Sequence, residues 1–172
     1  MKRLFNFFKK QTDKNIDLND SNYISNQESI LSKLNNEKQK ELLNNGFIKL
    51  KVLDTEKTNQ LLNLYLSQPN ARREDFGFHV SLDINQENIV NTIAQKISEI
   101  IQPNVDLFLN NYQFISPRFA VKEANQNSLV PPHQDWSFVD ETEFQSYNLW
   151  IALSPSKLDN GTLGFLPKSH NK

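Results

Sequence analysis

The hydrophobic residues of the first half of the chain recur at helical spacing. From residue 25 onward, apolar side chains follow one another three or four positions apart in three successive stretches, as on the inner face of an amphipathic helix. Gly46 is placed to end the first stretch, while Asp54 and Asn85 are placed to cap the next two. The second stretch ends near Pro69 and the third at Pro103. The inner-face residues are Ile30, Leu31, Leu34, Leu42 and Leu43, then Leu61, Leu62, Tyr65 and Leu66, then Ile89, Ile93, Ile97, Ile100 and Ile101.

A strand-like period of two appears between the first two helices and again after Pro103. In residues 46–53, Ile48, Leu50 and Val52 alternate with polar positions, as in a half-buried strand. Turn residues separate the later candidates, above all at Asp159-Asn160-Gly161. The later expected strands are Val105–Leu109, Tyr112–Val121, His133–Val139, Tyr147–Leu153 and Thr162–Leu166. The chain is therefore predicted to be α+β, mainly β, with about three helices before a sheet made by non-local pairing.

The N-terminal stretch lacks a sustained apolar period. Its basic start and the apolar patch from Leu4 to Phe8 look like a signal peptide, but the patch is shorter than the roughly 7–15 residues of a signal h-region. We therefore predict a flexible polar lead-in over residues 1–24 and a single domain over 25–172. No segment approaches the roughly 18 consecutive apolar residues of a membrane span, so the cytoplasm is the default expectation.

Composition narrows the chemistry. The 172 residues carry 19 Lys and Arg against 20 Asp and Glu, so the formal net charge of -1 argues against a role in binding nucleic acid or an anionic membrane. The absence of cysteine excludes disulfides, thiolate zinc sites and cysteine nucleophiles. A transition-metal site would have to use carboxylates and the three histidines, His79, His133 and His170.

The sharpest chemical feature is the run Pro131-Pro132-His133-Gln134-Asp135. Because side chains alternate across a strand, His133 and Asp135 are expected to point to the same side. An imidazole nitrogen beside a carboxylate oxygen supplies two of the three ligands in the facial triad of non-haem Fe(II) enzymes. The tripeptide alone is weak evidence, because a surface strand accounts for most such pairs.

Further motifs follow the His-X-Asp pair in a fixed order. Asn148-Leu-Trp-Ile-Ala-Leu-Ser comes next, and then Asp159-Asn-Gly-Thr-Leu-Gly-Phe-Leu-Pro-Lys-Ser-His170. From about Gly46 to the C-terminus the chain resembles the phytanoyl-CoA dioxygenase family of Fe(II)/2-oxoglutarate-dependent oxygenases. The resemblance implies a double-stranded β-helix, a cupin-like jelly roll of two facing sheets with helices on one side.

The same resemblance implies a set of roles. His133 and Asp135 match the first two iron ligands, and Trp150 matches an aromatic position that lies against 2-oxoglutarate in relatives. Trp150 also shares a strand face with Asn148 and Ala152, although packing in the core is the alternative for a large aromatic residue. The implied activity is hydroxylation of a small organic substrate with O2, since relatives that halogenate lack the carboxylate of Asp135.

The family's second His ligand, and the Arg that binds the far carboxylate of 2-oxoglutarate, are expected beyond the turn Pro167-Lys168-Ser169-His170, outside this chain. We thus expect a jelly roll without its last strands, whose unpaired edges favour self-association. Whether this chain is an enzyme stays open. It is either an incomplete dioxygenase, or one completed by another polypeptide or by strand exchange in a dimer, or a catalytically inactive fragment or ligand-binding module. In the last case Trp136 and Phe138 would form a hydrophobic interface. His170 is the remaining candidate for a third ligand, but the His of this turn is structural in relatives, and a pairing or packing role is favoured for His79.

Overall fold

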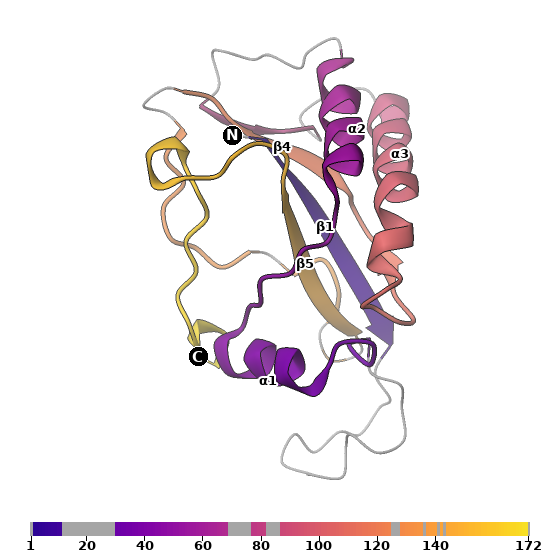
Figure 1. The fold of residues 1–172 in the computed structure, drawn as a ribbon, viewed down its shortest axis with the longest axis vertical. Coiled ribbons are helices and arrows are strands. Elements are labelled where there is room, and N and C mark those ends of the chain that lie inside the picture. The colour runs from indigo at the N-terminus through magenta and orange to yellow at the C-terminus, as the bar shows by residue number, and fades with distance from the viewer. Residues whose placement is uncertain are drawn as a thin grey trace.

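The computed structural model describes residues 2–11, 30–68, 77–81, 87–124, 128–135, 137–140, 142 and 144–171, with the backbone alone for 2–11. Within these residues three α-helices and five strands form an α+β fold (Figure 1). This agrees with the predicted class, although helical residues outnumber strand residues in the parts described. The described strands belong to one sheet, so the jelly roll stays a prediction.

Each of the first two helices begins at a side-chain cap. Helix α1 (Asn36–Asn45) starts where the Asn35 side chain accepts a hydrogen bond from the Lys38 N–H at 2.9 Å. Helix α2 (Thr55–Leu66) starts where Asp54 accepts from the Lys57 N–H at 2.8 Å, as predicted. These caps satisfy backbone donors that the first helical turn leaves unpaired.

Helix α3 (Glu87–Val105) continues two residues past Pro103, where the sequence predicted its end. Its predicted N-cap lies outside the described residues. The predicted strand Val105–Leu109 is wrong, because the backbone there leaves α3 through turns: the N–H groups of Phe108 and Leu109 bond the Val105 carbonyl. A proline near the end of a helix removes one hydrogen bond without stopping the last turn.

The sheet is antiparallel and is organised around β1. One edge of β1 (Lys2–Gln11) pairs with β5 (Phe144–Ala152) along nearly its whole length. The other edge pairs with β4 (Arg118–Lys122) and, further along, with the short β3 (Gln113–Phe114). Strand β2 (Phe78–Val80) extends the sheet beyond β4.

The expected flexible lead-in is therefore wrong for residues 2–11, which form the strand that joins β5 to the rest of the sheet. The prediction was wrong because it relied on regular alternation within the local sequence. The pairing of β1 depends instead on strands more than a hundred positions away in the sequence. Residues 12–24 of the predicted lead-in lie outside the described part of the chain.

Helices α2 and α3 lie against one face of the sheet, and the core fills the space between them (Figure 1). The buried face of α3 matches the predicted isoleucine stripe, with Ile97 and Ile101 fully buried. Ile151 on β5 and Leu153, the residue after its end, are buried in the core, as predicted from the alternation. The core comprises Ile30, Leu31, Leu34, Leu61, Tyr65, Ile93, Ile97, Ile101, Val105, Leu109, Phe119, Val121, Ile151 and Leu153.

Three other expected strands are not strands. Residues 46–53 pack Ile48, Leu50 and Val52 against the core, but they pair with no strand of the described sheet. The described parts of residues 133–139 and residues 162–166 likewise pair with no strand of the described sheet. In residues 46–53 the alternation correctly predicted half-buried side chains. A strand, however, also requires a second strand beside it to complete the backbone hydrogen bonds.

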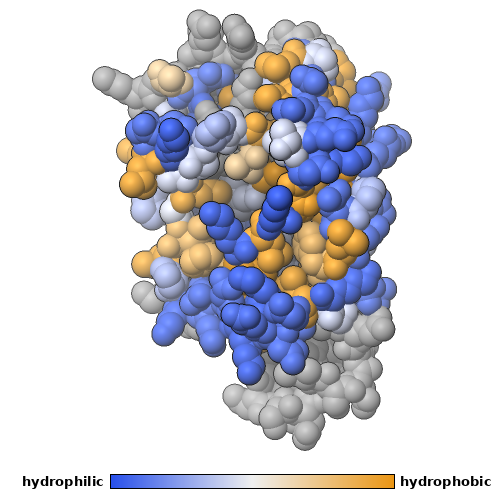
Figure 2. Space-filling model, in the orientation of Figure 1, coloured by the Kyte–Doolittle hydropathy of each residue, from blue (hydrophilic) through white to orange (hydrophobic). Residues whose placement is uncertain are grey.

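The C-terminal segment ends against α1. A short 3-10 turn at Leu158–Asn160 ends at Gly161, whose φ of 80° is left-handed, as expected for the Asp-Asn-Gly sequence. The chain then returns to α1, where Phe165 stacks on Phe47 with ring centroids 4.9 Å apart. A last 3-10 turn, Ser169–Asn171, closes the described chain there. The face shown in Figure 2 carries mostly polar side chains over the helices, with apolar ones between them.

Candidate metal centre

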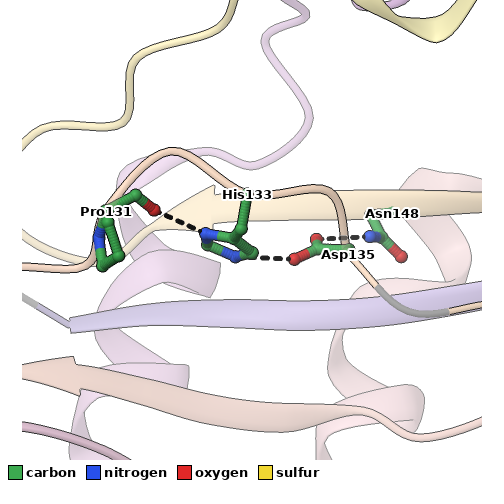
Figure 3. A network of polar contacts seen from close by, with 4 residues as sticks. All are labelled: Pro131, His133, Asp135 and Asn148. Atoms are coloured by element: carbon green, nitrogen blue, oxygen red, sulfur yellow. Dashed lines mark hydrogen bonds and ion pairs between the residues drawn. The ribbon is translucent and has the colours of Figure 1, made fainter. Parts of the chain in front are cut away.

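His133 and Asp135 lie side by side in the segment that leads from β4 to β5 (Figure 3). The His133 Nε2 and Asp135 Oδ1 atoms are 3.2 Å apart, and the two side chains are 51% and 32% exposed. The segment is not a strand, so the expected reason for their proximity is wrong while the proximity itself is present.

The backbone fixes the orientation of the His133 ring. Its Nδ1 lies 2.8 Å from the carbonyl oxygen of Pro131. Because a carbonyl oxygen can only accept, Nδ1 carries a proton and donates it. Backbone carbonyls hold many metal-binding histidines in this way, leaving the other nitrogen free to coordinate.

This orientation of the His133 ring determines which atoms face each other in the contact between His133 and Asp135. With the proton on Nδ1, a neutral His133 presents the lone pair of Nε2 to the carboxylate oxygen of Asp135. Two acceptors at 3.2 Å repel each other unless a cation or a second ring proton lies between them. The pair is therefore arranged to attract positive charge.

Asn148, on β5, holds the other oxygen of this carboxylate. Its side-chain Nδ2 donates to Asp135 Oδ2 at 2.6 Å, so Oδ1 faces His133 while Oδ2 faces Asn148 (Figure 3). Asn148 opens the second sequence motif, which predicted no role for it. The feature of the sequence that could have indicated a role in the site is that Asn148 is expected on the same face of the strand as Trp150.

Trp150 lies two residues further along β5, on the strand face opposite the buried Ile151. It is partly buried, whereas Asn148 is exposed. The predicted division of the two strand faces is thus confirmed, and Trp150 is on the face that carries the Asn148–Asp135 contact. Its role beside 2-oxoglutarate stays a prediction.

The other two histidines have separate locations. His79 is buried on β2, with 5% of its surface exposed. His170 places Nε2 3.0 Å from the Leu43 carbonyl oxygen near the C-terminus of α1. Within the described ranges no group of three or more His, Asp or Glu side chains comes together to hold a metal ion. His133 and Asp135 are the predicted site residues that the fold brings into contact.

The segment after the pair is shaped by a local turn at Asp140. Its carboxylate accepts from the Thr142 hydroxyl at 2.6 Å and from the Thr142 N–H at 2.9 Å. These hydrogen bonds lower the pKa of Asp140, because they favour its charged form. The turn leads the chain from the candidate site into β5.

The two donor atoms fit an octahedral Fe(II) ion as neighbouring ligands. Such ligands lie about 3 Å apart when metal–ligand bonds are about 2.1 Å, close to the 3.2 Å between Nε2 and Oδ1. One imidazole and one carboxylate also match the ligand types of the 2-His-1-carboxylate triad. The pair thus has the donor types and the spacing that two neighbouring ligands of such a triad require.

An α+β fold with this His-X-Asp pair fits a non-haem metal protein, and comparison with known proteins identifies the family. The family model described as "Phytanoyl-CoA dioxygenase (PhyH)" matches residues 32–172, most of the chain. The chain belongs to this family, which confirms the resemblance seen in the motifs. Its members are in general Fe(II)/2-oxoglutarate-dependent dioxygenases.

A curated relative supports the family more weakly. "Phytanoyl-CoA dioxygenase domain-containing protein 1" of Bos taurus is 39% identical over 57 residues, which cover 33% of this chain and 20% of the relative. The chain therefore matches about a fifth of that relative's length. No solved structure matches this chain significantly. None of the described helices is long and apolar enough to cross a membrane.

Proposed function

We propose that the protein is an Fe(II)/2-oxoglutarate-dependent dioxygenase that hydroxylates a small organic substrate, with His133 and Asp135 as two of the iron ligands. The observation that carries the proposal is the 3.2 Å approach of Nε2 to Oδ1 with the proton of His133 held on Nδ1. Membership of a dioxygenase family supports the same reading. The incomplete jelly roll implied by the family is part of this proposal.

The roles of the chain's own residues follow from their contacts. The Pro131 carbonyl holds the His133 tautomer, and Asn148 keeps Asp135 Oδ1 turned toward the imidazole. Trp150 would lie against 2-oxoglutarate from the same face of β5. Fe(II) with 2-oxoglutarate and O2 supplies the oxidising power when bound, while these residues bind and orient.

The test is anaerobic titration of the protein with Fe(II), followed by 2-oxoglutarate. We expect one Fe(II) per chain and a visible charge-transfer absorption band on adding 2-oxoglutarate. His133→Ala and Asp135→Ala should each weaken Fe(II) binding at least tenfold, since each removes a ligand. The matched control is Asp159→Ala, which removes an exposed carboxylate from a different turn.

The outcomes separate the proposal from the open alternative. Iron binding that depends on Asp135 but gives no band with 2-oxoglutarate would favour an inactive or ligand-binding module. Iron binding that is equally strong in Asp135→Ala and Asp159→Ala would contradict the metal site. Oxygen-dependent decarboxylation of 2-oxoglutarate, lost in His133→Ala, would establish the enzyme.

A further inference from the structure

Arg118, at the start of β4, lies on the face of the sheet that carries the candidate metal centre. Phe5 of β1 pairs with Arg118 on one edge and with Trp150 of β5 on the other. Residues directly opposite one another in antiparallel strands turn their side chains to the same face of the sheet. The next residues along β4 and β5, Phe119 and Ile151, are both buried in the core. Arg118 and Trp150 therefore share the face that points away from the core.

The spacing between Arg118 and the candidate ligands suits a small molecule. Neighbouring strands lie about 4.8 Å apart and residues follow at about 3.4 Å along a strand, so the Cα atoms of Arg118 and Asn148 are roughly 12 Å apart across this face. Asn148 donates to Asp135, which places the His133 and Asp135 pair at one end of that distance. The side chains at both ends shorten the gap, so a short organic molecule is long enough to reach both.

The segment that carries His133 and Asp135 also reaches Arg118. Phe138 follows Asp135 by three residues, and the Cζ atom of Arg118 lies over its ring, 5.2 Å from the ring centre. A cation–π contact of this kind uses the positive charge and does not by itself occupy the five N–H donors of the guanidinium. A guanidinium held over a ring can therefore donate two parallel hydrogen bonds to a carboxylate.

The face beside Arg118 is partly covered. Ala120, two residues further along β4 on the same face, is 2% exposed although it is not part of the core cluster. Lys122 extends from the same strand to the turn at Gly161, where an added Cβ would lie 3.2 Å from its Cδ atom. Hydrogen bonds between charged groups are stronger where water is partly excluded. The surroundings of Arg118 thus favour a bound anion over a solvated one.

We propose that Arg118 binds a carboxylate group of the substrate, so that the substrate of this site is a small organic acid. The proposal rests on the proposed function, since it names the substrate class of the same site. Arg118 donates to both oxygens of the carboxylate, and Phe138 holds the guanidinium in position. The rest of the substrate extends toward His133 and Asp135. A carboxylate of 2-oxoglutarate has the same chemistry, and the experiment distinguishes the two sources.

The test compares hexanoate with hexanamide, two probes of equal chain length of which only hexanoate is charged. Ligand-observed NMR titration of the metal-free protein measures the affinity of each. We expect hexanoate to bind at least tenfold more tightly than hexanamide. Arg118→Met keeps an unbranched side chain without the charge and should abolish this preference, while Arg118→Lys should retain part of it. The matched control is Lys51→Met, which removes an exposed positive charge outside the sheet and should leave the preference unchanged.

A second variant tests the position of the guanidinium without removing it. Phe138→Leu takes away the aromatic ring, and we expect hexanoate to bind two- to fivefold more weakly while hexanamide is unaffected. This variant and Arg118→Lys keep the proposal testable if Arg118→Met does not fold. Unchanged hexanoate binding in Phe138→Leu would contradict the positioning role of the ring.

Three results would overturn the proposal. The first is equal binding of hexanoate and hexanamide by the unmodified protein, and the second is an undiminished preference in Arg118→Met. The third is a weakened 2-oxoglutarate absorption band in Arg118→Met, which would assign the bound carboxylate to the co-substrate. Because the NMR titration contains no iron, it is independent of the Fe(II) titration. A protein that prefers hexanoate through Arg118 but binds no Fe(II) would contradict the proposed function alone.

Discussion

The Asp135 carboxylate lies between a near neighbour in the sequence, His133, and a residue of β5, Asn148. His133 faces one oxygen across 3.2 Å, and Asn148 donates to the other at 2.6 Å. A hydrogen bond that restrains a ligating carboxylate raises metal affinity by reducing the reorganisation needed on binding. Asn148 is therefore a positioning residue in the proposed site.

Replacing Asn148 tests this role. In Asn148→Ala the carboxylate loses its restraint, and we expect Fe(II) affinity to fall about 10–100-fold. Stability should change by less than about 1 kcal/mol, because Asn148 is exposed. Competition titration with a chelator measures the affinity, and urea unfolding measures the stability.

The control for that experiment is Gln145→Ala, on the same strand and without a contact to Asp135. It should bind Fe(II) like the unmodified protein. An equal loss of affinity in both variants would show that β5 as a whole, rather than the Asn148 amide, matters.

Single residues show how far sequence reasoning reaches at the site. The closeness of His133 and Asp135 was predictable because two positions separate them, and local geometry alone can bring such side chains together. The role of Asn148 was not, because its contact with Asp135 depends on how the intervening turn at Asp140 returns the chain to β5.

Among the elements, α1 and the C-terminal segment are joined by a tight contact at Gly46. This glycine ends α1 with a φ of 81°, and its N–H bonds the Leu42 carbonyl. A Cβ added there would lie 2.8 Å from His170 Cγ. The absence of a side chain therefore serves both the left-handed backbone and the packing of His170.

A double-mutant cycle separates these two effects. Gly46→Ala should destabilise the protein by about 1–3 kcal/mol through the left-handed conformation, with an added cost from the clash. In the His170→Ala background the contacts with the imidazole ring are gone and a tight contact with the Cβ of residue 170 remains, so Gly46→Ala should cost less. Urea unfolding of the four proteins measures the coupling.

Gly164→Ala is the matched control, since no atom lies within 4 Å of the Cβ that it would add. Its effect should stay near zero. An identical cost of Gly46→Ala with and without His170 would contradict the contact between α1 and the C-terminal segment.

The helices and strands also differ in whether nearby or distant residues determine their formation. The cap at Asp54 and the isoleucine stripe of α3 act within a few residues, so α2 and α3 were predictable. The first predicted helix is wrong before Asn36, because Ile30, Leu31 and Leu34 lie in turns that precede α1. Residues 46–53 and β1 show the opposite case. Residues 46–53 alternate like a strand but have no neighbouring strand to pair with. Strand β1 pairs with strands that lie far away in the sequence and come beside it only in the folded chain.

Across the whole molecule, two tyrosines couple stability to alkaline pH. Burial, chiefly, raises the pKa of Tyr147. Burial, then the hydrogen bond and the charge of Asp106, raise the pKa of Tyr112 strongly. Both phenols therefore stay protonated in the folded protein at pH values where the unfolded chain ionises.

The sign of the pH effect follows from proton binding. Below about pH 10 both states keep the phenol protons, and the stabilisation is fully present. Above that pH the unfolded chain binds fewer protons than the folded one, so the free energy of unfolding falls as pH rises. For Tyr147 the slope is up to about 1.4 kcal/mol per pH unit.

We expect Tyr147→Phe to lose less stability than the unmodified protein as the pH rises above about 10. Urea unfolding at a series of pH values measures this difference, and absorbance at the phenolate band follows the ionisation itself. Parallel pH curves for the two proteins would contradict the role of Tyr147.

The central place of β1 also has a consequence for how the protein is made. Arg3 pairs with Ala152, roughly 150 positions later in the chain, and pairing of this range raises contact order and slows folding. During synthesis β1 leaves the ribosome long before β4 and β5 exist, and its Leu4, Phe5, Phe7 and Phe8 form a short apolar stretch that chaperones could bind. Assembly of the sheet must therefore wait until translation has passed β5.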